Sequence, residues 1–360
     1  MGRVLNASLL EALGSEMGLS DLEAIRLLLR GSSVIDWNRA NFRSYEEVDR
    51  FFSLHHFFLE DSDDLQRIYG LHRSAVTYLE EHLGLRFPTE LRDPQDIREL
   101  FLLASIKQGF SRYQILACVI LKLMHVLHHL DAAELRFQIP LSEAALLDET
   151  AKQIEKAAQR MMSSNLSVKA FYGNRKSRNS IITKLLAKRE NIAATVFDKL
   201  RFRIITEGVE DILPTLVWLS RELFPFNYVI PNQSNNSLVS FREMIDSEYL
   251  DALRVILTSN GIDSKDELNE DQKNTFSGDS YKIINFIVDI PVRIDHLVSL
   301  SDNSLGKVVF VMVEFQVLDQ HTSQHNEEGE NAHVFYKTRQ LKQVKARLRM
   351  GGRRWRESQR

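Results

Sequence analysis

Residues 307–318, KVVFVMVEFQVL, decide the fold class of this chain. Their β-branched and aromatic side chains predict a buried β-strand, yet Glu314 and Gln316 alternate onto one face of it. A buried carboxylate costs free energy unless it is paired or bound to a metal. We therefore interpret Glu314 either as half of an ion pair or as a metal-binding or basic catalytic group, and the sequence leaves both open.

Two further runs of the same composition predict more strands in the second half of the chain. They are TVFDKLRFRIIT, residues 195–206, and YKIINFIVDIPVRI, residues 281–294. The turn-rich segment 295–306 separates the second run from KVVFVMVEFQVL, which favours an antiparallel ribbon with an extended connection.

The first half of the chain predicts helices instead. Residues 20–31 combine a capping box with an apolar periodic stretch, and Asp93 is expected to cap a second helix. A third helix is expected over residues 111–131 and a fourth from Ser142 onward.

The expected fold class is α+β, in three parts. We expect a helical domain over residues 1–165 with a regulatory or oligomerising role, a strand-rich domain over 166–340, and a basic C-terminal tail over 341–360. The tail is also a candidate for contact with RNA phosphates, although solvated basic tails are common.

Composition favours a soluble cytoplasmic protein. The 360 residues are 44% hydrophobic, carry a net charge of -3 and include one cysteine, Cys118, so no internal disulfide forms and a reduced compartment is expected. The start of the chain has no secretory signal pattern, and the apolar run around Cys118 is interrupted by Lys122. We expect no membrane partner.

Residues 173–190, GNRKSRNSIITKLLAKRE, place Lys176, Ser180 and Lys184 at intervals of four. On a helix this spacing lines one face with two cations and a hydroxyl, which suits a polyphosphate. The alternative is a solvated basic helix face.

Asp198 precedes a strand pattern in which Arg201 and Arg203 share a face. Because Asp198 has the opposite parity, it can act with Arg203 only from the strand entrance or from a bulge. An acid in that place is usually a turn or cap residue, and a functional role needs a partner carboxylate. Glu314 is the candidate partner.

These three segments together resemble one family, the RelA/SpoT-like nucleotide pyrophosphokinases that make the alarmones (p)ppGpp. The similarity covers residues 166–340 and implies a nucleotidyltransferase domain with a mixed β-sheet flanked by helices. The phosphate motif matches at Lys176, Ser180 and Lys184, with Asn174 at the motif's Arg position, and the second motif matches at Asp198 and Arg203. The last motif matches at Glu314, Gln316, Glu327, Gly329, Ala332, His333, Tyr336 and Lys337.

The chain also departs from the family pattern. Arg201 replaces a small residue, and Leu318 and Asp319 replace an Arg and a Thr. The acceptor segment, whose Tyr stacks on guanine in the family, is echoed only in residues 227–238, where Asn235 is not followed by an aromatic residue. No His-Asp hydrolase signature is visible in the first half.

The resemblance implies Mg²⁺-dependent transfer of pyrophosphate from ATP to a ribose hydroxyl of a GDP- or GTP-type nucleotide. The donor phosphates would be held by Lys176, Ser180, Lys184 and the adjacent Arg175. Asp198 and Glu314 would bind Mg²⁺, Arg203 would offset charge on the phosphoryl oxygens, and Gln316 would orient ligands.

Other functions stay open on the sequence. The chain could be a pseudo-enzyme that binds a nucleotide or RNA without transfer, or it could modify tRNA instead of a nucleotide. His321 and His325, one helical turn apart, are a weak zinc candidate, and His125 and His129 are more typical of core or interface residues.

Overall fold

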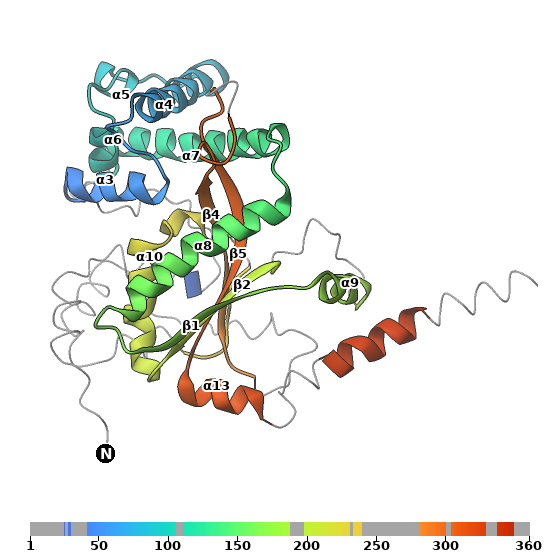
Figure 1. Cartoon of the computed structure of the whole chain (residues 1–360). Coiled ribbons are helices and arrows are strands. Elements are labelled where there is room, and N and C mark those ends of the chain that lie inside the picture. Colours follow the sequence, from blue (N-terminus) through green and yellow to red (C-terminus); the bar gives the residue numbers. More distant parts are fainter. Residues whose placement is uncertain are drawn as a thin grey trace, which may run out of the picture.

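The computed structural model describes residues 42–105, 111–187, 198–230, 233–239, 281–299, 304–328 and 337–348, together with positions 25, 28 and 29. Helices precede a sheet in these residues, so the expected α+β class is confirmed (Figure 1).

The helices before the sheet begin where capping side chains stand. Their bounds are α3 (Tyr45–Leu54), α4 (Ser62–Leu83), α5 (Thr89–Arg92), α6 (Arg98–Ala104), α7 (Arg112–Gln138) and α8 (Glu143–Met162). Ser111 and Ser142 accept hydrogen bonds from the first turns of α7 and α8, as their sequences predict. The prediction that Asp93 caps a helix is wrong, because Asp93 ends α5 and the next helix begins at Arg98.

Five strands form a mixed sheet in the order β1-β2-β5-β4-β3. Their bounds are β1 (Val168–Arg175), β2 (Leu200–Thr206), β3 (Asn235–Asn236), β4 (Ile284–Arg293) and β5 (Val308–Asp319). The expected antiparallel pairing of β4 with β5 is confirmed, and β2 runs parallel to β5. The parallel pair sets the register of the functional face.

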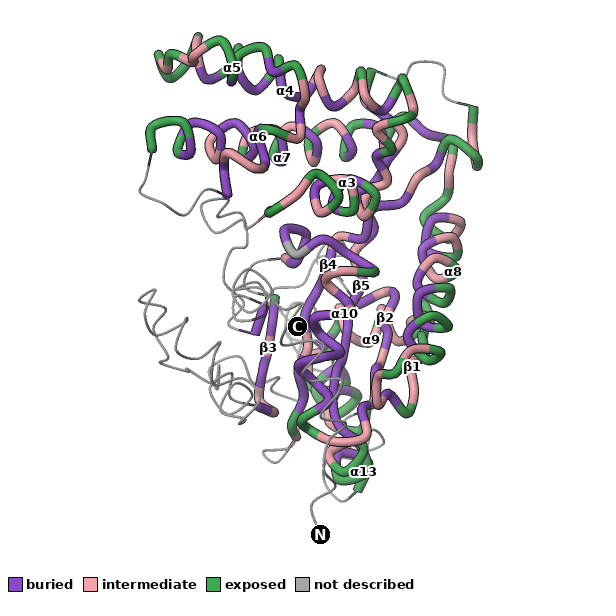
Figure 2. The backbone as a smooth tube through the Cα atoms, turned by 90° about the vertical axis from the view of Figure 1, so that its left-hand side faces the viewer, coloured by how far each residue is buried: buried purple, intermediate pink, exposed green. Residues whose placement is uncertain are grey.

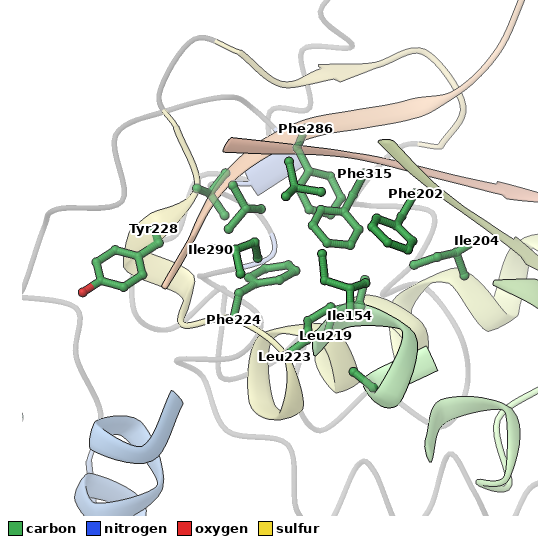
Figure 3. Packing of buried hydrophobic residues seen from close by; sticks show 14 of the residues in the cluster. Ile154, Phe202, Ile204, Leu219, Leu223, Phe224, Tyr228, Phe286, Ile290 and Phe315 are labelled. Atoms are coloured by element: carbon green, nitrogen blue, oxygen red, sulfur yellow. The ribbon is translucent and has the colours of Figure 1, made fainter. Parts of the chain in front are cut away.

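One face of the sheet carries the main hydrophobic core. Phe202, Phe286 and Phe315 come from neighbouring strands, with ring centroids 5.6 Å apart between Phe286 and Phe315 (Figure 3). Ile154 of α8 and Leu219 of α10 (Ile212–Glu222) pack on the same cluster. Figure 2 shows α8 with its buried side toward the sheet and an exposed outer side. α8 lies before the expected domain boundary near residue 165, yet it shares the core of the sheet. That boundary stays a prediction.

Helices α3 to α7 gather at the end of the sheet where β4 leads into β5 (Figure 1). Arg293 donates to Asp64 at 2.6 Å and to Asp61 at 3.2 Å, and Lys307 lies 3.0 Å from Asp63. These acids belong to the start of α4. The ion pairs therefore tie α4 to the connection between β4 and β5.

The described residues include one helix, α7, that is long and apolar enough to cross a membrane. A core helix of a soluble protein has the same properties, and α7 packs against α4, α6 and β5.

Four histidines lie between α3, α7 and the sheet: His55, His125, His128 and His129. We call them the histidine cluster. Burial lowers the pKa of His55 to about 3 and that of His129 to about 4. His129 stacks on Phe310 of β5 with centroids 4.2 Å apart, and Asp289, whose pKa burial raises to about 6, lies 3.9 Å from its Nδ1. His55, His125 and His128 are buried and His129 is partly exposed, which agrees with the core or interface role that the sequence favoured for His125 and His129.

Candidate functional site

The face of the sheet opposite the core is polar, and strand register brings its residues together. In the parallel pair, Arg201 of β2 lies opposite Glu314 of β5, and Arg203 lies opposite Gln316. On the other side of β5, Asn285 of β4 lies opposite Gln316. A row of cations from β2 therefore faces a row of acceptors from β5.

Glu314 is the acidic centre of this face. Its side chain is only 7% exposed, and Oε2 accepts from Nε of Arg201 at 2.5 Å. Oε1 accepts from the amides of Asn285 and Gln316, the latter at 3.2 Å. The ion pair that the sequence allowed is present, and a metal-binding or basic catalytic role for Glu314 stays a prediction.

Gln316 extends the hydrogen-bond network from Glu314 to Arg203. Its Oε1 accepts from Nε and from the terminal nitrogen of Arg203 at 3.2 and 3.0 Å. A third guanidinium nitrogen of Arg203 lies 4.0 Å from Glu327, which belongs to α13 (Gln320–Glu327) and is largely exposed. Glutamine therefore fixes the plane of this guanidinium without neutralising it.

Asp198 lies in the turn before β2, at the strand entrance. Its side chain is 8% exposed; Oδ1 accepts from Nζ of Lys184 at 2.8 Å, and Oδ2 accepts from Nζ of Lys176. Oδ2 also accepts from Arg201 at 3.3 Å. Asp198 thus lies at the strand entrance, the place that the sequence requires if it acts with Arg203, but Arg203 donates to Gln316 and not to Asp198. Arg201 instead joins Asp198 to Glu314.

Electrostatics in this cluster favour the charged forms. Burial alone would raise the pKa of Asp198, but Lys184 and Lys176 outweigh it and hold this pKa well below the usual range. Burial likewise opposes charge on Arg201, yet Glu314 and Asp198 raise its pKa. Burial lowers the pKa of Lys176, and Asp198 offsets only part of that effect.

The two lysines reach Asp198 from different elements. β1 continues to Arg175, and the helix that follows, α9 (Arg178–Ala187), begins only after Lys176. The prediction that Lys176 and Lys184 line one helix face is therefore wrong. Lys176 extends from the end of a strand, where its N–H donates to the carbonyl of Lys199 at 2.9 Å, and Lys184 extends from the helix.

Ser180 and Arg175, the other expected phosphate ligands, make different contacts. The hydroxyl of Ser180 lies 3.0 Å from that of Ser177, at the start of α9. Arg175 forms an exposed ion pair with Asp148 of α8 at 2.7 Å. Among the described residues, neither side chain forms a hydrogen bond with Asp198 or Glu314.

The remaining motif positions have mixed outcomes. Gly329, Ala332, His333 and Tyr336 lie outside the described residues, and Lys337 lies in the helical stretch described over 337–348, with an exposed side chain. Leu318, at the motif's Arg position, is fully buried. Asp319 caps α13 by accepting from the N–H of Thr322 at 3.0 Å, a role that a Thr can also serve.

In the acceptor segment, Asn235 and Asn236 form β3 at the edge of the sheet. The amide oxygen of Asn236 accepts from the N–H groups of Leu238 and Val239, so this side chain shapes a turn. No aromatic residue stands at these positions. Tyr281 was not predicted; burial raises its pKa, and the charges of Arg203 and Arg201 act on it in the opposite direction.

Metal binding finds little support in the donor set. No group of three or more His, Cys, Asp or Glu side chains suited to a metal occurs in the part of the chain that the structure describes. His321 and His325 are exposed on α13. Asp198 and Glu314 do lie in one cluster, but Arg201 contacts both, so Mg²⁺ at these carboxylates stays a prediction that this arrangement does not favour.

Comparison with known proteins returns alarmone synthetases among solved structures. No model of a known protein family matches the chain, and no curated protein matches it. Small alarmone synthetase 1 of Bacillus subtilis, solved with its product pppGpp, is 13% identical, with 59% of this chain and 94% of that chain covered and a TM-score of 0.31.

A GTP pyrophosphokinase family protein of Streptococcus pneumoniae is 11% identical over 61% of this chain and 93% of its own, with a TM-score of 0.29. Small alarmone synthetase 2 of B. subtilis is 14% identical over 59% and 93%, with a TM-score of 0.27. Because these TM-scores are low, membership of the family is a proposal that rests on the residues of the chain.

Proposed function

We propose that the protein is a divergent nucleotide pyrophosphokinase that transfers pyrophosphate from ATP to a ribose hydroxyl of a nucleotide such as GDP or GTP. One observation supports this best. Lys176 and Lys184, Asp198 and Arg201, and the sequence-distant Glu314 form a single hydrogen-bonded cluster beside the sheet.

Pyrophosphate transfer suits such a cluster because it needs charge neutralisation and alignment more than covalent chemistry by the protein. The side chains of Lys176 and Lys184 are about one fifth exposed, so a polyphosphate arriving from solvent can compete with Asp198 for their ammonium groups. In this proposal they hold the donor phosphates.

Arg203 is suited to the charge that develops on the phosphoryl oxygens. Its guanidinium is held by the neutral oxygen of Gln316 and faces one acid, the largely exposed Glu327 at 4.0 Å, with which an incoming phosphate can compete. Glu314 orients Arg201 in the same way that Gln316 orients Arg203. We assign these two β5 residues positioning roles.

A second candidate is binding of a nucleotide or RNA without transfer. The observation that favours it is Arg201, which engages both carboxylates expected to serve the chemistry. The lack of an aromatic residue after Asn235 points the same way. Transfer to tRNA is a variant of the enzyme proposal; it draws on the basic tail, most of which lies outside the described residues.

ATP labelled in its β- and γ-phosphates separates these functions. The protein is incubated with the label and a panel of GDP, GTP, other nucleotides and tRNA. Label on a nucleotide supports the proposal, and label on tRNA changes the acceptor. Bound ATP with no labelled product supports the binding function.

The matched variants are Lys176→Ala with Lys184→Ala, and Lys152→Ala as the control. Lys152 is an exposed lysine of α8 paired with Glu149, away from the cluster. The double variant is expected to lose transfer and the control to keep it. Equal activity in both would remove the donor site from these lysines.

A further inference from the structure

Arg201 occupies the centre of the cluster, at a position where the sequence pattern of the resembling family has a small residue. Its Nε donates to Glu314 and one terminal nitrogen donates to Asp198. The side chain comes from β2, whose register with β5 fixes it opposite Glu314. A single guanidinium therefore spans two carboxylates that are 113 and 3 residues away in sequence.

Every oxygen of these two carboxylates already accepts a hydrogen bond. In Glu314, Oε2 faces Arg201, and Oε1 faces the amides of Asn285 and Gln316. In Asp198, Oδ1 faces Lys184, and Oδ2 faces Lys176 and Arg201. Mg²⁺ takes carboxylate oxygens as ligands, and here cationic or amide donors already face each of these oxygens, so the ion would have to compete with protein donors at both acids.

A guanidinium does the electrostatic work that a divalent ion does between two acids. It stays protonated at all pH values relevant to proteins, and its fork of N–H groups matches carboxylate geometry. Unlike an ion, it is covalently attached, so neither dilution nor a chelator removes it. Its side chain is one third exposed, which leaves part of the fork for an incoming phosphate.

We propose that Arg201 is a resident cation that takes the place of a divalent ion between Asp198 and Glu314, so that the site binds the triphosphate chain of a nucleotide with no metal ion held by these acids. The inference rests on the proposed function and states which form of ATP, free or bound to Mg²⁺, the site prefers. The cations of the cluster, Lys176, Lys184, Arg201 and Arg203, outnumber the two buried acids. Free ATP, which carries more negative charge than its Mg²⁺ complex, is the better matched ligand.

Mn²⁺ alone provides the first test, with binding to the full chain followed by electron paramagnetic resonance of the free ion. The native protein is expected to bind no Mn²⁺ at these acids. Arg201→Ala is expected to bind about one equivalent, because the spanning cation is gone and the acids keep their places. Adding Glu314→Gln to that variant is expected to abolish the binding.

Arg203→Ala is the matched control, since this arginine lies on the same face of β2 but contacts Gln316 and not the two acids. It is expected to gain no Mn²⁺ site. The inference is overturned if the native protein binds one Mn²⁺ that Glu314→Gln removes, or if folded Arg201→Ala gains no site. Circular dichroism establishes that each variant is folded.

ATP affinity measured by calorimetry, once with excess EDTA and once with excess Mg²⁺, is the second test and uses the native protein only. We expect binding in EDTA at least as tight as in Mg²⁺. Binding weaker by about tenfold or more in EDTA, a loss of about 1.4 kcal/mol, would overturn the inference and leave the proposed function standing. No binding of ATP in either buffer would instead overturn the proposed function itself.

Discussion

Replacing Asp198 by Asn tests how strongly the cluster depends on one carboxylate. The substitution keeps the size of the side chain but removes the charge that Lys176, Lys184 and Arg201 share. Removing one partner of a buried ion pair typically costs 3–5 kcal/mol, and because the two lysines can turn partly to water we expect about 2 to 4 kcal/mol here.

Asp148→Asn supplies the control for this experiment. Asp148 is paired with Arg175, but the two side chains are 61% and 45% exposed, so its loss should cost at most about 0.5 kcal/mol. Both variants and the native protein are unfolded with urea at neutral pH, and the free energies of unfolding are compared.

Inorganic tripolyphosphate adds a second readout to the same variant. Without Asp198 the three cations lack their common anion, so a bound polyphosphate should raise the unfolding midpoint of Asp198→Asn more than that of the native protein. If Asp198→Asn is as stable as Asp148→Asn, and tripolyphosphate stabilises all three proteins equally, the ion pairs of Asp198 do not stabilise the fold and the three cations do not bind a polyphosphate.

Three further predictions concern stability. His128 has both ring nitrogens buried without a hydrogen-bond partner among the described residues, so His128→Leu should raise the free energy of unfolding by about 1 kcal/mol; a loss measured by urea unfolding would contradict this. A Cβ on Gly173 would lie 2.5 Å from the ring of the buried Phe202, so Gly173→Ala should lower it by about 1 to 3 kcal/mol; an unchanged thermal midpoint would show that the ring gives way. The histidine cluster takes up protons on unfolding because its pKa values are depressed in the folded protein, so the stability present above pH 6.5 should fall as the pH drops toward 4. The expected loss is about 1.4 kcal/mol per pH unit for each net proton taken up. Asp289, whose pKa is raised, opposes part of this change. A flat stability profile over that range would contradict the last prediction.

Much of the fold could be read from local patterns. Apolar β-branched runs located β4 and β5, and serine caps located the starts of α7 and α8, because these signals act within a few residues. Asp93 misled the prediction because an acidic residue before an apolar stretch suits either a helix start or the end of a short preceding helix. Here α5 precedes it, and that single turn carries little signal of its own.

The sequence predicted some members of the cluster, Lys176, Lys184, Asp198 and Glu314, but it did not predict Arg201 or the contacts between these residues. Lys176 and Lys184 have helical spacing, yet Arg175 pairs with Leu200 in the β1–β2 ladder, which keeps the chain extended up to the first lysine. Tertiary pairing thus overrode a local period. The Arg201 to Glu314 contact depends on the register of two strands distant in sequence, and no local pattern encodes that register.

The most direct test of the account is calorimetric titration of ATP into the native protein and into Lys176→Ala with Lys184→Ala. The account predicts one bound ATP in the native protein and an affinity at least about tenfold lower in the double variant, because each lost charge-assisted hydrogen bond contributes about 1.5 kcal/mol or more. Equal affinity in the two proteins, with both shown to be folded, would contradict the claim that this face of the sheet binds a nucleotide polyphosphate.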